Sequence, residues 1–210
     1  MKTIEAKTPE QRTDEWYANR RGKFTGSQIS NLLGIKGLGA TGETYAFEKA
    51  VERLHGKLDE DFVSYDMQRG LDLEPLAFAK FKELKEPEFI DVDHCTFFEY
   101  GDNAGATPDG LTSDNGILEI KCPKPSTFFK LVATNQIDKK YFAQMQLEMM
   151  ATGADKAYFF NYMVHEGREY WHEIVVERDE ELINKIDQRI NEATIIRDQF
   201  IEQLKSNQQF

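Results

Sequence analysis

The chain has 210 residues and a formal net charge of −11, with 40% hydrophobic and 30% charged residues. This length suits one sizeable core, and no Pro-, Gly- or Ser-rich linker divides it, so we expect a single domain over residues 1–210. Its two cysteines, Cys95 and Cys122, are too few for a disulfide framework or a four-cysteine metal site. The acidic charge argues against a simple basic-patch DNA binder, because lysine and arginine normally neutralise the phosphates.

Other classes of function are disfavoured by motifs that the sequence lacks. No apolar run approaches the roughly 20 residues needed to span a bilayer, and the N-terminal sequence lacks the layout of a signal peptide. We therefore expect a cytoplasmic protein without membrane association. No histidine spacing typical of a metal site, no Ser/His/Asp arrangement and no Gly-rich nucleotide loop appears, which disfavours hydrolase triads and nucleotide-dependent chemistry.

The first part of the chain is expected to be helical. Helices are predicted over residues 13–21, 27–33, 44–55 and about 66–84. Ser27 is a plausible N-cap of the second helix, the glycine-rich stretch GIKGLGATGE is expected to form a loop, and Gly56 is suitably placed to end the third helix. Pro75 either interrupts or starts the fourth helix, since proline biases the residue before it away from helical geometry.

The second part of the chain mixes strands and helices. In chain order we predict strands and turns over 88–118 with the strand GILEIKC, helices over 126–134 and 139–152, the paired strands KAYFFNYMV and EYWHEIVVE, and a long helix over about 179–204. The two paired strands are joined at His165-Glu166-Gly167. The order of helices, mixed sheet, helices, sheet edge and helix predicts an α/β (α+β) fold.

The most informative segment combines an aspartate in a turn with two charged residues on a strand. Asp109 lies in Thr-Pro-Asp-Gly-Leu, and Glu119 and Lys121 lie in Ile-Leu-Glu-Ile-Lys. Because strand side chains alternate, Glu119 and Lys121 project from one face. A hairpin-like return can bring Asp109 beside Glu119, and two carboxylates with a carbonyl oxygen such as that of Ile120 suit Mg²⁺. Lys121 would then contact the nucleophile or the phosphate during phosphodiester hydrolysis.

Each of these candidates also has a purely structural interpretation. Glu119 and Lys121 could form a surface salt bridge near an aspartate in a turn. Glu74 lies among apolar neighbours in the sequence. It is either a third metal-site carboxylate or an exposed residue at a helix start. Gln144 forms the main polar stripe of an apolar helix with Glu148, and it either orients the attacking water or a phosphate oxygen or is an amide bonded inside the core.

Cationic and hydroxyl side chains near the N-terminus form a candidate phosphate site. Arg20, Arg21 and the stretch Thr25-Gly26-Ser27 place guanidinium groups, hydroxyls and a predicted helix N-terminus close together, although a helix cap alone has the same pattern. Further lysines could line a DNA path beyond the metal site: Lys124, Lys130, Lys139 and Lys140. For Lys130, Lys139 and Lys140, a solvated protein face is the favoured interpretation.

In order and spacing, these segments resemble the phage lambda exonuclease family, also called YqaJ-like viral recombinases, of the PD-(D/E)xK nuclease superfamily. The similar stretches are EWYANRRGKFTGSQIS, GLDLE, TPDGL with LEIKCP, YFAQMQLEM and IVVERDE. The resemblance implies a restriction-endonuclease-like core, in which helices flank a mixed central β-sheet. The long C-terminal helix is a candidate for subunit contacts.

The resemblance also implies a role for each candidate residue. The implied Mg²⁺ ligands, with Mn²⁺ as a substitute, are Asp109, Glu119 and the Ile120 carbonyl, with Glu74 as a further candidate ligand. Lys121 is implied to be catalytic, with Glu74 and Gln144 in support. A pocket for the 5′-phosphate of a DNA end would be built from Arg20, Ser27 and Thr107. Thr107 stands where the family has a familiar serine, a change that keeps the hydroxyl.

We therefore predict a Mg²⁺-dependent processive 5′→3′ exonuclease that acts on linear double-stranded DNA. By two-metal-type hydrolysis it would release 5′-mononucleotides and leave 3′ single-stranded ends for phage-type recombination by strand annealing. The resemblance further implies a ring-shaped homotrimer, a single-strand-annealing partner protein, and a phage or prophage origin in a bacterial host. The alternatives are an endonuclease or junction resolvase on the same fold, which needs no 5′-phosphate pocket, and a non-catalytic DNA-binding module.

Overall fold

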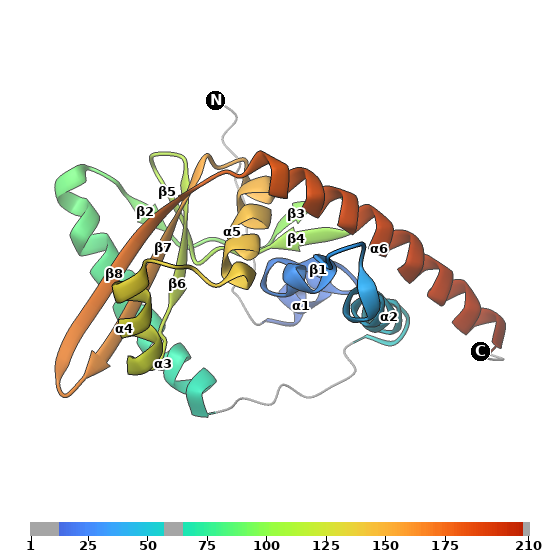
Figure 1. The fold of residues 1–210 in the computed structure, drawn as a ribbon, viewed down its shortest axis with the longest axis horizontal. Coiled ribbons are helices and arrows are strands. Elements are labelled where there is room, and N and C mark those ends of the chain that lie inside the picture. The colour runs from blue at the N-terminus through green and yellow to red at the C-terminus, as the bar shows by residue number, and fades with distance from the viewer. Residues whose placement is uncertain (1–12, 57–64, 208–210) are drawn as a thin grey trace.

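The computed structural model of the chain describes residues 13–56 and 65–207 (Figure 1). Its helices are α1 (Asp14–Arg20), α2 (Gly39–His55), α3 (Tyr65–Lys85), α4 (Pro125–Thr134), α5 (Lys139–Thr152) and α6 (Glu180–Asn207), with the 3₁₀ helices η1 (Gly26–Leu32) and η2 (Glu86–Glu88). Its strands are β1 (Phe24–Thr25), β2 (Val92–Asp93), β3 (Phe98–Tyr100), β4 (Ala104–Ala106), β5 (Gly110–Thr112), β6 (Gly116–Lys121), β7 (Lys156–His165) and β8 (Arg168–Glu177). Among the described residues, no helix combines the length and apolar character needed to cross a membrane.

A five-stranded mixed sheet forms the centre of the molecule, in the order β2-β5-β6-β7-β8. Within this sheet β6 and β7 pair in parallel and the other pairs are antiparallel, and α4 and α5 make the connection between β6 and β7. The faces of this sheet follow the alternation of strand side chains. Leu118 and Ile120 pack with Phe81 of α3 on one face, whereas Ile117 packs with Met145 of α5 on the other. The predicted mixed sheet flanked by helices is therefore confirmed (Figure 1).

A second, three-stranded sheet lies beside α5, in the order β1-β4-β3. Its core joins strand residues such as Phe24 to Tyr45 of α2, Leu147 of α5 and Ile190 of α6. Helix α6 runs diagonally past α5 toward α2 (Figure 1). The same helix α5 thus packs against the central sheet and against this smaller unit, so it holds the two sheets in one arrangement.

One buried arginine connects α6 to the smaller sheet. The Arg197 side chain is 1% exposed, and its guanidinium donates to the Gly22 carbonyl at 2.9 Å and to Asn103 Oδ1 at 2.8 Å. It also donates to Asp198, whose side chain is 54% exposed. The two hydrogen bonds satisfy the buried Gly22 carbonyl and the half-buried Asn103 side chain.

The hairpin of β7 and β8 forms at the predicted turn. Glu166 and Gly167 both have positive φ, 50° and 72°, and His165 pairs with Arg168 across the hairpin. A two-residue loop with positive φ at both positions has the twist that suits antiparallel strands. Glycine adopts that geometry at little cost, which explains why the turn could be read from the sequence.

Three predicted elements differ from the observed ones. The helix predicted over 27–33 is the 3₁₀ helix η1 (Gly26–Leu32), and its N-cap is Thr25, without a side-chain cap, rather than Ser27. Helix α2 begins at Gly39, inside the expected loop, and Gly42 in its first turn lies so close to η1 that a Cβ would be 3.2 Å from the Asn31 carbonyl oxygen. The close approach of η1 therefore favours glycine at position 42, although glycine has a low helix propensity. Helix α3 continues through Pro75 to Lys85.

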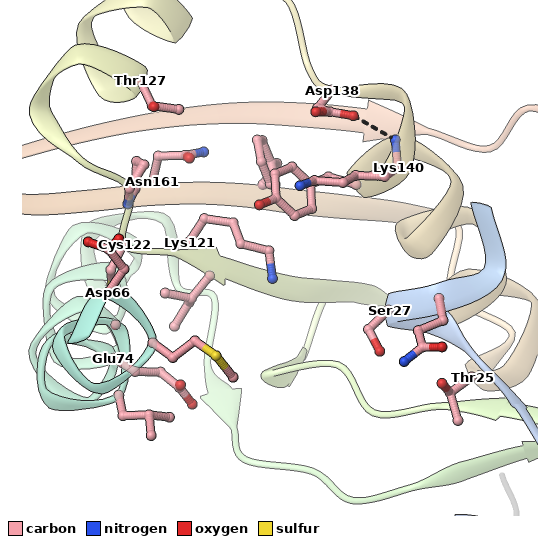
Figure 2. Close-up of a pocket in the computed structure, with 18 of the residues that line it drawn as sticks. Thr25, Ser27, Asp66, Glu74, Lys121, Cys122, Thr127, Asp138, Lys140 and Asn161 are labelled. Carbon is pink, nitrogen blue, oxygen red and sulfur yellow. Dashed lines mark hydrogen bonds between the residues drawn. The ribbon is translucent and has the colours of Figure 1, made fainter. Parts of the chain in front are cut away.

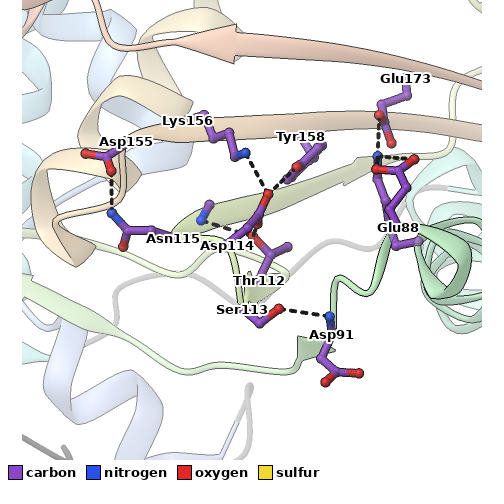
Figure 3. A network of polar contacts seen from close by, with 12 residues as sticks. Glu88, Asp91, Thr112, Ser113, Asp114, Asn115, Asp155, Lys156, Tyr158 and Glu173 are labelled. Atoms are coloured by element: carbon purple, nitrogen blue, oxygen red, sulfur yellow. Dashed lines mark hydrogen bonds and ion pairs between the residues drawn. The ribbon is translucent and has the colours of Figure 1, made fainter. Parts of the chain in front are cut away.

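A polar network closes the turn between β5 and β6 (Figure 3). Asp114 accepts hydrogen bonds from Thr112 at 2.5 Å and from Tyr158 at 2.6 Å, and it forms an ion pair with Lys156 at 2.6 Å. Thr112 in turn accepts from the Gly116 amide at 3.0 Å. Burial alone would raise the pKa of Asp114, but the hydrogen bonds from Lys156, Thr112 and Tyr158 lower it to about 2. The network therefore fixes the hairpin in which β5 and β6 pair.

We expect acid to weaken the wild-type protein more than the Asp114→Asn variant. The pKa of Asp114 is about 2 in the fold and roughly 3.9 in an unfolded chain, so its contribution is complete above about pH 4 and is lost as the pH falls toward 2. At about pH 7 the variant should lose about 1–2 kcal/mol of unfolding free energy. Urea unfolding at several pH values should show this cost shrinking as the pH falls.

The exposed turn residue Asp102 offers the control for this experiment. Asp102→Asn should change the unfolding free energy by less than about 0.5 kcal/mol at every pH. A cost of Asp114→Asn that stays constant from about pH 7 to pH 3 would contradict a lowered pKa for Asp114.

Candidate active site

The β5–β6 hairpin places Asp109 beside the end of β6. Asp109 immediately precedes β5, and its amide donates to the Leu118 carbonyl at 2.9 Å. Its side-chain Oδ2 accepts from the Ile120 amide at 2.6 Å. The turn aspartate predicted to return toward Glu119 therefore reaches the neighbouring backbone of the same strand.

Glu119 and Lys121 project from one face of β6, as the alternation predicts. The Lys121 ammonium forms an ion pair with Glu119 Oε1, and the Gln144 amide of α5 donates to the same oxygen at 2.7 Å. Glu119 is 1% exposed, so this face carries a buried carboxylate opposite α5. The structure thus brings together Asp109, Glu119, Lys121 and Gln144 from three segments of the chain.

A further carboxylate joins this group. The Gln144 amide also donates to Glu148 Oε1 at 2.8 Å, and Glu148 is 1% exposed. The sequence contained a signal for this pair, because residues four apart on a helix share a face. It gave no sign that Glu148 would lie at the same site as Glu119, since that depends on how α5 packs against β6.

The electrostatics of the group are dominated by burial and by repulsion between carboxylates. Burial, and then the charge of Glu119, raise the pKa of Asp109 well above its usual value, against the effect of Lys121. Burial and Glu119 likewise raise the pKa of Glu148. Burial alone would lower the pKa of Lys121, but Glu119 and Asp109 raise it overall. The Lys121 ammonium therefore faces the carboxylates of Glu119, Asp109 and Glu148 in a poorly solvated space.

These residues fit a hard divalent cation. Asp109, Glu119 and the Ile120 carbonyl supply oxygen ligands, and the buried Glu148 Oε2 has no hydrogen-bond partner. A bound 2+ charge would relieve the repulsion that raises the pKa of Asp109 and Glu148. Within the described ranges, no three His, Cys, Asp or Glu side chains gather closely enough to hold a metal by themselves. The backbone carbonyl, water and phosphate would have to complete the coordination, as is usual for Mg²⁺.

Of this group, Lys121 lines a cleft of about 1890 Å³, and the buried carboxylates lie behind it. Figure 2 shows Lys121 extending from β6 into this cleft, with Glu74 of α3 on one side and Thr25 and Ser27 on the other. Ile120 also lines the cleft, and Glu74 is close enough for its charge to raise the pKa of Asp109. The structure therefore places Glu74 at the site. Within the described residues, Glu74 makes no hydrogen bond to Asp109, Glu119 or Glu148.

Arg20 and Thr107 meet at the same cleft. Arg20 lines it and donates to Thr107 Oγ1 at 3.2 Å, and its guanidinium stacks 3.9 Å from the centre of the Trp16 ring. Burial lowers the pKa of Arg20, although an arginine remains protonated under ordinary conditions. Ser27, on exposed surface of η1, lines the cleft as well. The three residues implied for a phosphate pocket thus lie at or beside one opening.

The lining of the cleft is basic although the protein is acidic. Nine Lys and Arg residues line it against six Asp and Glu residues, whereas the whole chain carries a net charge of −11. Four of the nine are the lysines considered for a DNA path: Lys124, Lys130, Lys139 and Lys140. Lys130, Lys139 and Lys140, for which a solvated face was favoured, therefore lie on the wall of the cleft. Positive charge is concentrated where a polyanion would bind.

Comparison with known proteins supports a nuclease fold. The family model of the YqaJ-like viral recombinase domain matches residues 15–155. An alkaline exonuclease, LHK-Exo from Laribacter hongkongensis, is 30% identical and superposes with a TM-score of 0.80, over 93% of this chain and 97% of that chain. The structure of LHK-Exo in complex with dAMP is also 30% identical, with the same coverage and a TM-score of 0.79.

A more distant structure shares the fold. A phage-related exonuclease from Haemophilus somnus 129PT is 18% identical and superposes with a TM-score of 0.66, over 90% of this chain and 100% of that chain. A search of curated protein sequences found no match to the chain. The likeness of the solved structures confirms the predicted fold class.

Proposed function

Because the chain belongs to the YqaJ-like viral recombinase domain family, we propose that it is a Mg²⁺-dependent 5′→3′ exonuclease acting on the ends of double-stranded DNA. The observation that carries this proposal is the convergence of Asp109, Glu119 and Lys121 beside a basic cleft. A non-catalytic DNA-binding module would have no use for buried carboxylates at a phosphate site, because they repel the ligand. The dAMP bound to LHK-Exo is the kind of mononucleotide that such a reaction releases.

In this mechanism each side chain has a distinct task. A cation held by Asp109, Glu119 and the Ile120 carbonyl would lower the pKa of a bound water and neutralise charge on the phosphate. Lys121 places a second positive charge beside Glu119, where it stabilises the charge that develops on the phosphoryl oxygens. Gln144 donates both its amide hydrogens to carboxylates, so its carbonyl oxygen remains to accept from the attacking water.

Arg20, Ser27 and Thr107 would bind the terminal 5′-phosphate. A guanidinium and two hydroxyls are donors suited to a phosphate dianion. Stacking on Trp16 and the bond to Thr107 keep the Arg20 guanidinium oriented before the DNA arrives. Holding the end at a fixed distance from Lys121 would make the enzyme cut one nucleotide from the 5′ end at each step.

The proposal is tested with linear duplexes that carry a 5′-phosphate at one end and a 5′-hydroxyl at the other, with closed circular DNA as the control. We expect Mg²⁺-dependent release of a 5′-label as a mononucleotide from the phosphorylated end, late release of a 3′-label, and an intact circle. Nicking of the circle would instead support the endonuclease alternative. Binding without hydrolysis of either substrate would support the non-catalytic one.

We expect Arg20→Ala to remove most of the preference for phosphorylated ends. Loss of a charge-assisted contact should lower kcat/KM on 5′-phosphorylated duplexes by about 10- to 100-fold, with a much smaller change on 5′-hydroxyl duplexes. Single-turnover digestion of both substrates measures the ratio. Arg53→Ala, which removes a half-exposed guanidinium outside the cleft, serves as the control. An unchanged ratio in Arg20→Ala would exclude Arg20 from the phosphate pocket.

We also propose that the protein assembles as a ring-shaped homotrimer and supplies 3′ single strands to an annealing protein in phage-type recombination. Family membership supports this part of the proposal. A ring would retain DNA by enclosing it, so an acidic protein could remain processive. Light scattering should give three times the mass of 24.3 kDa; a monomer at micromolar concentration would contradict the ring.

A further inference from the structure

The Gln144 side chain is held between two carboxylates. Its Nε2 donates to Glu119 Oε1 at 2.7 Å and to Glu148 Oε1 at 2.8 Å. Since a primary amide has two hydrogens, each has a carboxylate acceptor and the orientation of the amide is fixed. If the Glu148 acceptor were lost, the amide could rotate or flip, and its hydrogen bond to Glu119 would no longer be enforced.

Burying the Glu148 carboxylate lowers the stability of the fold. It is 1% exposed, and its Oε2 has no partner among the described residues, so desolvation of the carboxylate is poorly compensated. The carboxylate faces Gly26 of η1, where a Cβ would lie 3.7 Å from Glu148 Oε1, in ordinary contact. An apolar residue at this position of α5 would be the more stable choice. A function of Glu148 at the site explains why a carboxylate occupies it.

That function follows from the bonds of Glu119. Its Oε1 receives both Lys121 and Gln144, which leaves Oε2 for a cation. We propose that Glu148 is a positioning residue of the metal site, which acts through Gln144 to hold Glu119 in the rotamer that presents Oε2 to the cation. This inference rests on the proposed Mg²⁺-dependent function. Groups that orient a metal ligand in this way typically change metal affinity by about 10- to 100-fold.

The test is Mg²⁺ binding to the full-length protein without DNA, measured by isothermal titration calorimetry. Glu148→Leu removes the acceptor and should weaken binding by about 10-fold or more, whereas Glu148→Gln keeps an acceptor oxygen and should stay within about 3-fold of wild type. Gln146→Leu is the matched control. Gln146 is a buried amide of the same helix that bonds to the Glu177 carbonyl at 3.0 Å and the Asp179 amide at 2.8 Å, away from Glu119.

Each other outcome overturns the inference. Wild-type affinity in Glu148→Leu would show that Glu148 does not position the site. Equal weakening in Glu148→Leu and Glu148→Gln would assign the effect to charge rather than to the hydrogen bond. Equal weakening in Gln146→Leu would assign it to general loss of stability, which circular dichroism melting would reveal. If wild type itself binds no Mg²⁺, the metal site of the proposed function fails, and this inference fails with it.

Discussion

The Asp109→Asn protein is expected to release nucleotides at least about 10³-fold more slowly than wild type while keeping its fold. The substitution removes a charged ligand but keeps an oxygen that can accept from the Ile120 amide, as Oδ2 does at 2.6 Å. It also removes one of three carboxylates that repel one another in a buried space, so the unfolding free energy without Mg²⁺ should be equal or higher.

Two measurements on the same preparation check this expectation. Single-turnover digestion gives the rate, and urea unfolding in EDTA gives the stability. Asp93→Asn, an exposed carboxylate on β2 of the same sheet, should leave both unchanged. Near wild-type cleavage by a folded Asp109→Asn protein would remove Asp109 from the metal site, and a large loss of stability would refute the repulsion among the carboxylates.

Arg197→Met is expected to cost about 2–4 kcal/mol of unfolding free energy. The flexible methionine side chain can fill much of the buried space, but the Gly22 carbonyl and Asn103 Oδ1 lose their donor. An acceptor left without a partner in the interior keeps its full desolvation cost. Asp198 is half exposed and can return to water, so the broken ion pair adds little.

The midpoint of urea unfolding measures this cost. Lys205→Met on the same helix replaces an exposed partner of Glu202 and should change stability by less than about 0.5 kcal/mol. A loss below about 1 kcal/mol in Arg197→Met would mean that water or a rearranged side chain satisfies the two acceptors. It would also contradict Arg197 as the connection between α6 and the smaller sheet.

The sequence predicted those elements whose pattern is both local and periodic. The alternation along β6 and the turn at Glu166 and Gly167 each required only neighbouring residues, and both were found. The 3₁₀ form of η1 and the early start of α2 were missed, because they depend on packing between η1 and α2, such as the close approach of Gly42 to the Asn31 carbonyl. Tertiary packing here overrides the propensity of glycine to end or avoid a helix.

The candidate site was predictable to the extent that it lies on one hairpin. Asp109, Glu119 and Lys121 are close in the chain, so strand geometry alone places them together. Glu148 was missed as a member of the group because its approach to Glu119 depends on the packing of α5 over β6. The catalytic and phosphate-binding roles of these residues, and the single domain over 1–210, stay predictions.

The bond between Arg197 and Gly22 also bears on how the protein is made. At roughly 5–20 residues per second, a ribosome needs on the order of 10–35 s to add the stretch between them, since the two residues are 175 positions apart. During that interval the core around Phe24 also lacks Ile186, Ile190 and Ala193 of α6. Apolar surface around Phe24 therefore stays uncovered until α6 has been synthesised, and it is open to non-native contacts during that interval.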